Sequence, residues 1–186
     1  MKTSDLCDAR SDIVACELTL NSYGQHASFA GTVRTVQCFE DVDLIRQMVN
    51  QPGHDQVLVV DGGGSIRRAL FGDVMAGMAT QNGWCGLIFN GAIRDAVEVN
   101  GMAIGVKALG TAPRRGERTG AGQVDVPVSF GGVTFTPGCR VVADADGVVV
   151  LPPHLKETDI AVADTLAQTA AYATAAVGTV GALKQT

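Results

Sequence analysis

The feature that most constrains the fold is an uninterrupted apolar run, Val-Leu-Val-Val at positions 57–60, which ends in Asp61 and three glycines. A short run rich in β-branched residues is typical of a strand that is covered on both faces, as in a parallel sheet. Before it, apolar residues at helical spacing predict a helix over residues 40–50. The chain therefore alternates helix and buried strand.

The same pattern repeats downstream. Apolar residues on one side of the segment 73–82 predict a second helix, and the glycine and aspartate at its beginning are a start signal. Residues 86–89 form a second buried run, and the Asn-Gly dipeptide at positions 90–91 predicts a turn that closes it. Strand, helix and strand make a βαβ unit, which indicates an α/β fold.

The second half of the chain is richer in turns. An apolar segment, 104–109, is followed by a loop rich in glycine and arginine, 110–122. Alternating apolar residues, separated by Gly-Gly, Pro-Gly and Asp-Gly turns, then predict a β-meander. Its strands fall within residues 126–130, 133–135, 141–142 and 148–150.

The length of 186 residues fits one domain, and 46% hydrophobic residues are enough for a core. We place this domain at residues 1–154. The tail, 155–186, is rich in alanine and threonine, with helical potential over 155–177, and is predicted to be a helical extension.

The charge balance argues against some partners. The formal net charge is −5, whereas nucleic-acid binding depends on clustered Lys and Arg. The one basic cluster, Arg114, Arg115 and Arg118, is interrupted by Glu117 and is predicted to be a solvated loop. We therefore expect no direct contact with nucleic acid.

Targeting and cysteine patterns favour the cytoplasm. The N-terminus has no apolar signal core, and no window reaches the roughly 18 apolar residues of a membrane span. The five cysteines form no C-x-x-C pair and are expected to be small core residues, while the three histidines lack zinc-ligand spacing. A cytoplasmic protein without a membrane partner is expected.

Several motifs resemble binding or catalytic motifs, but a structural role explains each of them better. The segment 61–64 superficially resembles a nucleotide or S-adenosylmethionine loop, yet its glycines are contiguous and do not open into a helix, so we predict a turn. The segment 144–147, Asp-Ala-Asp-Gly, lacks the other ligands of a calcium loop and is predicted to be a hairpin turn. No G-x-S-x-G elbow is present, and a Schiff base on Lys107 is disfavoured.

One combination of segments could form a site. Residues 72–75 begin a helix, and Arg94 and Asp95 follow the next strand; in an open α/β sheet such ends converge in one crevice. Free amides at the helix start favour an anion, Arg94 could bind a carboxylate in bidentate fashion, and Asp95 is a hard ligand for Mg²⁺. The alternative is that Arg94 and Asp95 only cap a helix and pair with neighbours, and spacing alone leaves both interpretations open.

Seven short segments, taken in order and spacing, closely resemble the family that contains the regulator of ribonuclease activity A and the 4-hydroxy-4-methyl-2-oxoglutarate aldolases. The resemblance covers about residues 3–152. The matching segments are 3–9 (Thr-Ser-Asp-Leu-Cys-Asp-Ala), 57–62, 72–73, 91–95 (Gly-Ala-Ile-Arg-Asp), 127–128 with 131–133, 137–138 and 143–149.

The resemblance implies a swivelling β/β/α fold, like that of phosphohistidine domains, and a ring-shaped homotrimer with interfacial active sites, a stacked hexamer being the alternative. It also implies roles for individual residues. Arg94 would bind the pyruvyl part of the substrate, Asp95 would hold the divalent metal, and an acidic residue of a neighbouring subunit, unassigned in this sequence, would lie near the metal. Backbone amides would hold the substrate carboxylate, from Gly72, Asp73, Val74 and Met75.

Two functions follow from the resemblance. The first is an Mg²⁺- or Mn²⁺-dependent aldolase that cleaves 4-hydroxy-4-methyl-2-oxoglutarate to two pyruvates, with oxaloacetate decarboxylation as a side activity; Asp73 or a water would move the proton. The second is a non-catalytic regulator that binds and inhibits ribonuclease E. Three parts of the chain look like that branch: residues 38–41, residues 61–65 with 67–70, and residues 130–135. Asp95 favours the enzyme, because a binding protein needs no metal carboxylate. The loop 111–122 is the place to seek a second carboxylate contact.

Overall fold

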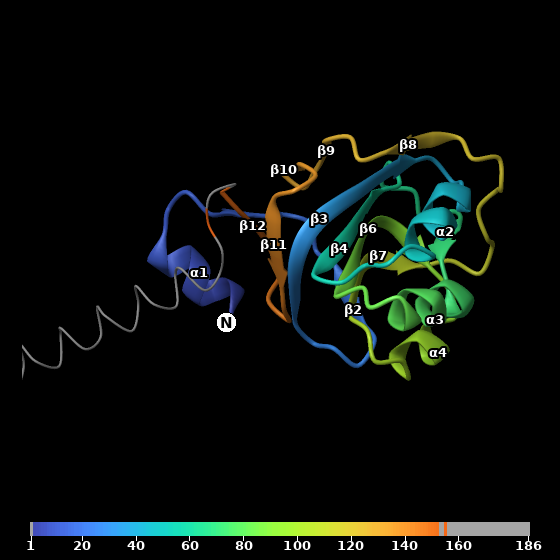
Figure 1. Cartoon of the computed structure of the whole chain (residues 1–186), viewed down its shortest axis with the longest axis horizontal. Coiled ribbons are helices and arrows are strands. Elements are labelled where there is room, and N and C mark those ends of the chain that lie inside the picture. The colour runs from blue at the N-terminus through green and yellow to red at the C-terminus, as the bar shows by residue number, and fades with distance from the viewer. Residues whose placement is uncertain (1, 153–154, 156–186) are drawn as a thin grey trace, which may run out of the picture.

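The computed structural model describes residues 2–152 and 155, and shows a mixed sheet with helices packed against it (Figure 1). Four helices are present in this part of the chain: α1 (Thr3–Ala9), α2 (Asp43–Val49), α3 (Asp73–Gln81) and α4 (Ala96–Asn100). The strands are β1 (Val14–Ala15), β2 (Asn21–Tyr23), β3 (Phe29–Cys38), β4 (Gln56–Asp61), β5 (Ala69–Phe71), β6 (Gly86–Ile93), β7 (Val106–Thr111), β8 (Gly122–Val124), β9 (Val128–Phe130), β10 (Val133–Phe135), β11 (Arg140–Ala143) and β12 (Val148–Leu151).

The large sheet has the order β1-β12-β11-β3-β4-β6-β7-β2, with β5 paired to β6 and β8 paired to β3. Its centre is parallel, because β3, β4, β6 and β7 pair in parallel, while the strands at both sides pair antiparallel. The α2 and α3 crossovers connect β3 to β4 and β4 to β6. The prediction of a βαβ unit in an α/β fold is confirmed, whereas the swivelling-domain assignment stays a prediction.

The run 57–60 is buried completely and divides its side chains between two cores. Leu58 and Val60 pack with α2 and α3, which lie with α4 on the right of the sheet in Figure 1. Val57 and Val59 pack on the opposite face, against β9, β10 and β11. Coverage of both faces explains why the strand is apolar without alternation.

Two predictions about the strands are wrong in detail. The expected turn at 90–91 is instead the middle of β6, where Asn90 and Gly91 are buried. The strand continues because β5 adds a parallel neighbour beyond β4, pairing Ala69 with Ala92, and because Gly91 leaves room for Leu70. The expected meander is two separate hairpins: β9 and β10 form their own two-stranded sheet, and β11 pairs with β12 and β3.

The predicted hairpin turn at 144–147 is confirmed. The Asp144 amide donates to the Gly147 carbonyl at 3.0 Å, and the Asp144 carboxylate accepts bonds from the amide and hydroxyl of Thr3, both at 2.7 Å. This contact holds α1 against the small core that contains Leu6 and Val149.

Within residues 2–152 and 155, no helix is long and apolar enough to span a bilayer. The predicted helical extension at 155–186 lies, apart from residue 155, outside the described residues.

Candidate functional site

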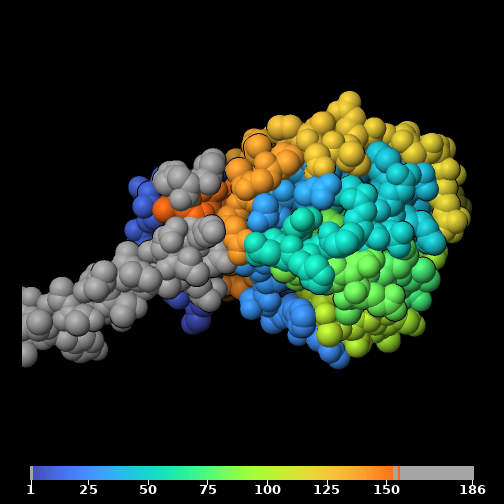
Figure 2. All heavy atoms as spheres, viewed as in Figure 1, coloured from blue at the N-terminus to red at the C-terminus, as the bar shows by residue number. Residues whose placement is uncertain are grey.

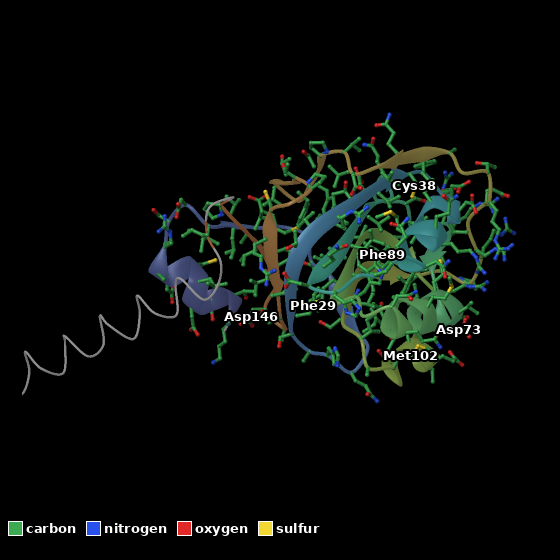
Figure 3. The ribbon with its side chains drawn as sticks, viewed as in Figure 1. Phe29, Cys38, Asp73, Phe89, Met102 and Asp146 are labelled. Atoms are coloured by element: carbon green, nitrogen blue, oxygen red, sulfur yellow. The ribbon has the colours of Figure 1, made fainter. Side chains whose placement is uncertain are left out.

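The start of α3 supplies backbone donors to the site. Gly72 is its N-cap in an extended conformation and is buried against the end of β5. The first turn of a helix contains amides with no acceptor inside the helix, here those of Asp73, Val74 and Met75. The Val74 amide donates to Asp73 Oδ1 at 2.7 Å, so the aspartate side chain occupies one of these donors. Figure 3 shows Asp73 at the end of α3 nearest the loop that follows β7.

Arg94 and Asp95 follow the last residue of β6. The Arg94 amide donates to the carbonyl of Phe71 at 2.9 Å, which ties the end of β6 to the end of β5 directly before Gly72. Asp95 adopts the left-handed conformation (φ 53°) that aspartate tolerates better than most residues, and this bend aims the chain into α4. The two predicted segments therefore meet at the carboxyl ends of neighbouring strands.

The Asp95 carboxylate is placed for interaction but lacks hydrogen bonds. Its Oδ2 lies 3.2 Å from Arg94 Nε, forming an ion pair between two side chains that are about two-thirds buried. Asp95 is the N-cap of α4, yet its side chain makes no capping hydrogen bond. Oδ2 is buried without a hydrogen-bond donor within the described part of the chain. Asp95 therefore does not cap α4 through its side chain, but it does pair with its neighbour Arg94, so both interpretations of the two residues stay predictions.

A cleft of about 150 Å³ opens beside this pair. It is lined by four of the predicted substrate-binding residues from β5–α3 and by Arg94, together with α2 and the loop after β7, which lie side by side in Figure 2. Asp95 does not line the cleft but lies behind Gly72 and Arg94. The full lining is Val42, Arg46, Ala69, Phe71, Gly72, Asp73, Val74, Met75, Arg94, Arg115 and Arg118.

Sequence reasoning missed part of this lining. Arg46 was expected only as a residue of the helix 40–50, and nothing local distinguishes it from a solvated arginine. Arg115 and Arg118 were expected on a solvated loop; their side chains are exposed, but they line the cleft, while Arg114 does not. Two residues of the loop 111–122 thus line the cleft, and a second carboxylate contact from this loop stays a prediction.

The loop after β7 is held by a buried carboxylate near the start of α2. Asp41 Oδ2 accepts hydrogen bonds from the amide and hydroxyl of Thr119, at 2.7 and 2.6 Å, and Oδ1 accepts one from the Asp43 amide. Burial raises the pKa of Asp41, but these hydrogen bonds outweigh it and leave the pKa below its usual value. Asp41 is therefore a charged anchor that holds one wall of the cleft.

The other candidates lie elsewhere. Residues 62–64 form a turn, with Gly63 and Gly64 at positive φ, and lead into β5 rather than a helix, so the predicted structural turn is confirmed. Lys107 is buried on β7, where its Nζ donates to Ser22 Oγ at 2.8 Å; burial lowers its pKa, and it does not line the cleft.

The surroundings of Asp95 Oδ2 indicate whether the site fits a divalent metal ion. A buried carboxylate oxygen without a donor suits a hard cation, and Mg²⁺ commonly takes one or two protein carboxylates while its other positions hold water or substrate. In residues 2–152 and 155, no three His, Cys, Asp or Glu side chains come together as ligands. The residues therefore fit a metal ion that is held by the Asp95 carboxylate and has open coordination positions. They do not fit a metal ion that is surrounded by protein ligands.

Comparison with known proteins gives one consistent family. A family profile described as RraA-like, Aldolase/RraA, matches residues 3–150. A Geobacillus kaustophilus HTA426 structure, described as an S-adenosylmethionine:2-dimethylmenaquinone methyltransferase, is 47% identical, with a TM-score of 0.81 and coverage of 83% of this chain and 97% of that one.

Two further structures are described as RraA proteins, the first of them as an RNA-processing inhibitor. RraA of Thermus thermophilis is 41% identical (TM-score 0.81; 84% of this chain, 96% of that one). RraAS2 of Streptomyces coelicolor, described as an unusual member of the RNase ES inhibitor RraA family, is 26% identical (TM-score 0.73; 93% of this chain, 91% of that one). These similarities extend over nearly the whole described domain.

Proposed function

The chain belongs to the RraA-like (Aldolase/RraA) family, and from this premise we propose that it is a divalent-metal-dependent aldolase that cleaves 4-hydroxy-4-methyl-2-oxoglutarate to two pyruvates. Oxaloacetate decarboxylation is proposed as a side activity, because loss of CO₂ from oxaloacetate develops the same charge on the same oxygen. The observation that carries the proposal is the buried, donor-free Asp95 Oδ2 beside Arg94 at the edge of a cationic cleft.

Substrate binding would use the start of α3. The amides of Gly72, Asp73 and Met75 point the positive end of the helix at the C1 carboxylate of a 2-oxo acid. The Val74 amide joins them when the Asp73 side chain, which accepts its bond here, turns away. Released in this way, the Asp73 carboxylate becomes available to the substrate.

Bond cleavage would then use two side chains. Removal of the C4 hydroxyl proton, by Asp73 or a water, lets the C3–C4 electron pair move toward C3, and the C2 oxygen gains negative charge. The Arg94 guanidinium would stabilise this oxygen. A divalent cation held by Asp95 would add Lewis-acid stabilisation of the same charge. Protonation of C3 completes the first pyruvate, and C4 becomes the carbonyl carbon of the second.

We propose a homotrimer with the cleft at the subunit interface. Val74, which lines the cleft, is 61% exposed, and Val97, two residues after Asp95, is 82% exposed, which suits coverage by a neighbouring subunit. Light scattering during gel filtration should give three times, or for a stacked hexamer six times, the 19.2 kDa of one chain. A monomer would overturn this part of the proposal.

The test of the activity is pyruvate release by protein stripped with EDTA and then supplied with Mg²⁺ or Mn²⁺. Wild-type turnover should depend on the metal, and Asp95→Ala should lose it at every metal concentration. Glu98→Ala, an exposed position in α4 outside the cleft, is the matched control and should retain activity. Absence of turnover with both 4-hydroxy-4-methyl-2-oxoglutarate and oxaloacetate would overturn the enzyme proposal.

A second function is supported by one observation, the 41% identity to a protein described as an RNA-processing inhibitor. On this alternative the chain binds ribonuclease E and lowers its cleavage rate without catalysis. Inhibition of purified ribonuclease E that is unchanged in Asp95→Ala, together with no aldolase turnover, would favour it. Inhibition together with metal-dependent turnover would show both functions in one protein.

A further inference from the structure

We propose that Arg68 is a positioning residue of the cleft, because its side chain holds the loop after β7 (residues 112–121) in the place where this loop forms part of the cleft wall. Its effect on catalysis rests on the proposed function, whereas its effect on the loop is measurable without turnover. Arg68 comes directly before β5 and does not itself line the cleft, so it acts through the loop and not on the substrate.

One side of this loop pairs with the beginning of β5. The Ala69 amide donates to the Arg114 carbonyl at 2.7 Å, and the Gly116 amide donates to the Ala69 carbonyl at 2.9 Å. Ala69 and Arg115 thus form a parallel bridge, and both residues line the cleft. The position of this part of the wall therefore depends on the bridge.

The other side of the loop pairs with the segment before α2. The Glu117 amide donates to the Glu40 carbonyl at 2.7 Å, and the Val42 amide donates to the Glu117 carbonyl at 2.9 Å. The approach is close, because a Cβ atom on Gly116 would come within 2.6 Å of the Glu40 carbonyl oxygen. The loop is therefore held from both sides over residues 115–117.

The Arg68 side chain joins the two sides. Its Nη1 lies 2.8 Å from Glu117 Oε1 and donates to the Arg115 carbonyl at 3.2 Å. Its Nε lies 3.5 Å from Glu40 Oε2. One planar guanidinium group thus faces three acceptors, which the single ammonium group of a lysine cannot match in geometry. Because an ion pair with the exposed Glu117 contributes little stability, the main effect of Arg68 is to fix the loop and not to stabilise the whole fold.

Glu40 is held in place by more than Arg68. Its φ of 53° lies in the left-handed region, which a glutamate adopts only where its surroundings hold it. Its carboxylate accepts hydrogen bonds from Ser65 Oγ at 2.6 Å and from Arg67 Nε at 2.8 Å. Neither bond involves Arg68. Loss of the Arg68 side chain should therefore free the loop while the segment 40–42 keeps its position.

Arg67 provides a matched comparison one residue away. It pairs with the same Glu40, and its guanidinium carbon lies 5.9 Å from the centre of the Phe39 ring. The Arg67 side chain is 73% exposed, against 29% for Arg68, and among the described residues its ion pair and its ring contact do not involve the loop. Arg67 therefore shares the charge and the acidic partner of Arg68 but not its contact with the loop.

A loosened loop should weaken substrate binding more than the reaction itself. The loop lines the cleft, whereas Arg94 and Asp95 follow β6 and are tied to the end of β5 and to Gly72. When the binding-competent position is populated for only a fraction of the time, the apparent affinity falls by that fraction. The KM should therefore rise while kcat changes little.

The test combines hydrogen exchange, read by mass spectrometry on the peptide 112–121, with steady-state pyruvate release in Mg²⁺. Arg68→Gln should raise the exchange rate of this peptide about 10-fold. It should raise KM about 5-fold and leave kcat within about twofold of wild type. Arg68→Lys should restore part of the protection, and Glu117→Gln should weaken it in the same direction from an exposed position. Arg67→Gln is the matched control and should behave as wild type in both measurements.

Melting temperatures verify that each variant is folded. Equal exchange of the loop in Arg68→Gln and Arg67→Gln would overturn the role of Arg68, as would a loosened loop with an unchanged KM. A fall in kcat without a rise in KM would overturn it as well, because the loop would then act on the reaction and not on binding. Faster loop exchange in Arg68→Gln alone, in a protein without aldolase turnover, would support the role of Arg68 in the loop and overturn only the proposed function.

Discussion

Gly72 and Asp95, which follow two different strands, lie against each other, with Gly72 in the lining of the cleft and Asp95 behind it. A Cβ atom on residue 72 would come within 2.6 Å of Asp95 Oδ2 and within 3.1 Å of Arg94 Cγ. The backbone of Gly72 is extended, a conformation that any residue adopts. Glycine is therefore needed at this position because a side chain would lack space, and not because of the backbone conformation. The glycine thus permits the close approach on which the position of the Asp95 carboxylate depends.

Gly72→Ala is expected to move the Asp95 carboxylate and to lower kcat/KM for the proposed aldolase reaction by about 100-fold, because small misplacements of catalytic groups have effects of this size. Steady-state pyruvate release at saturating Mg²⁺ measures kcat/KM for the variant and for wild type. Gly77→Ala is the control: its Cβ meets nothing within 4 Å, and alanine should stabilise α3 by about 0.5–1 kcal/mol without a change in activity. Equal activity of the two variants would contradict the structural role of Gly72.

Asp41 is expected to stabilise the arginine-bearing wall of the cleft. It is 3% exposed and accepts bonds from Thr119 and Asp43, so Asp41→Asn should lower the free energy of unfolding by about 1–3 kcal/mol. Because the folded pKa is lowered, the stabilisation is complete above the ordinary pKa near 4 and is lost as the pH falls through the folded value.

Urea unfolding of wild type and Asp41→Asn at pH 7 and at pH 3 measures this effect. Asp43→Asn is the control, since within the described residues the Asp43 side chain accepts a single, exposed hydrogen bond, from Gln47. If Asp41→Asn is as stable as Asp43→Asn at pH 7, the anchor is not energetically important. The difference in unfolding free energy between wild type and Asp41→Asn should be smaller at pH 3 than at pH 7.

The parallel centre of the fold and the position of the site could be predicted because their signals are local. The run 57–60 and the helix start at Gly72 are each visible within a few residues, and parallel strands bring their carboxyl ends to one edge. The Asn-Gly dipeptide at 90–91 misleads because β5 pairs with β6 across it, a contact that no local pattern encodes.

The cationic wall could not be predicted for the same reason. Arg46 becomes part of the site only because Val42 bonds to Glu117, 75 positions later, and Asp41 bonds to Thr119. From the sequence, an arginine on an amphipathic helix and a cluster of arginines in a loop are most simply explained as solvated charges. Their common position depends on long-range hydrogen bonds of a buried carboxylate.

Asp144 is expected to fix the N-terminal helix to the sheet. Burial raises its pKa, but hydrogen bonds from Thr3 and from the amides of Asp146 and Gly147 bring the pKa below the usual value. Asp144→Ala should cost about 1–3 kcal/mol and raise amide exchange in α1. As for Asp41, the contribution should disappear as the pH falls below about 4, since protonation removes the charged acceptor.

Hydrogen exchange read by mass spectrometry on the peptide 2–12 tests this prediction at pH 7. Asp146→Ala is the matched control in the same turn, because Asp146 is exposed and contributes only its backbone amide to Asp144. Protection of α1 that is equal in the two variants would show that the core around Leu6, and not the Asp144 carboxylate, holds the helix.

Cys38 is expected to be an unreactive thiol. It is 7% exposed, and burial, with a smaller contribution from the charge of Asp41, raises its pKa to about 12. At pH 8.5 less than about one thiol in a thousand is ionised, so iodoacetamide should modify Cys38 far more slowly than the half-buried Cys139. Peptide mapping over time measures both rates in the same sample.

The same shift predicts how stability responds to alkali. The folded state keeps the Cys38 proton that the unfolded state releases above its ordinary pKa of 9.0, so the stabilisation is complete below that value and declines as the pH rises toward about 12. Each pH unit in this window should cost about 1.4 kcal/mol through this group. Cys38→Ala should therefore show a shallower loss of unfolding free energy between pH 9 and 11 than wild type. Parallel slopes, or rapid alkylation of Cys38 in the folded protein, would mean that its thiol is accessible to water and that the packing of β3 against α2 is looser than described.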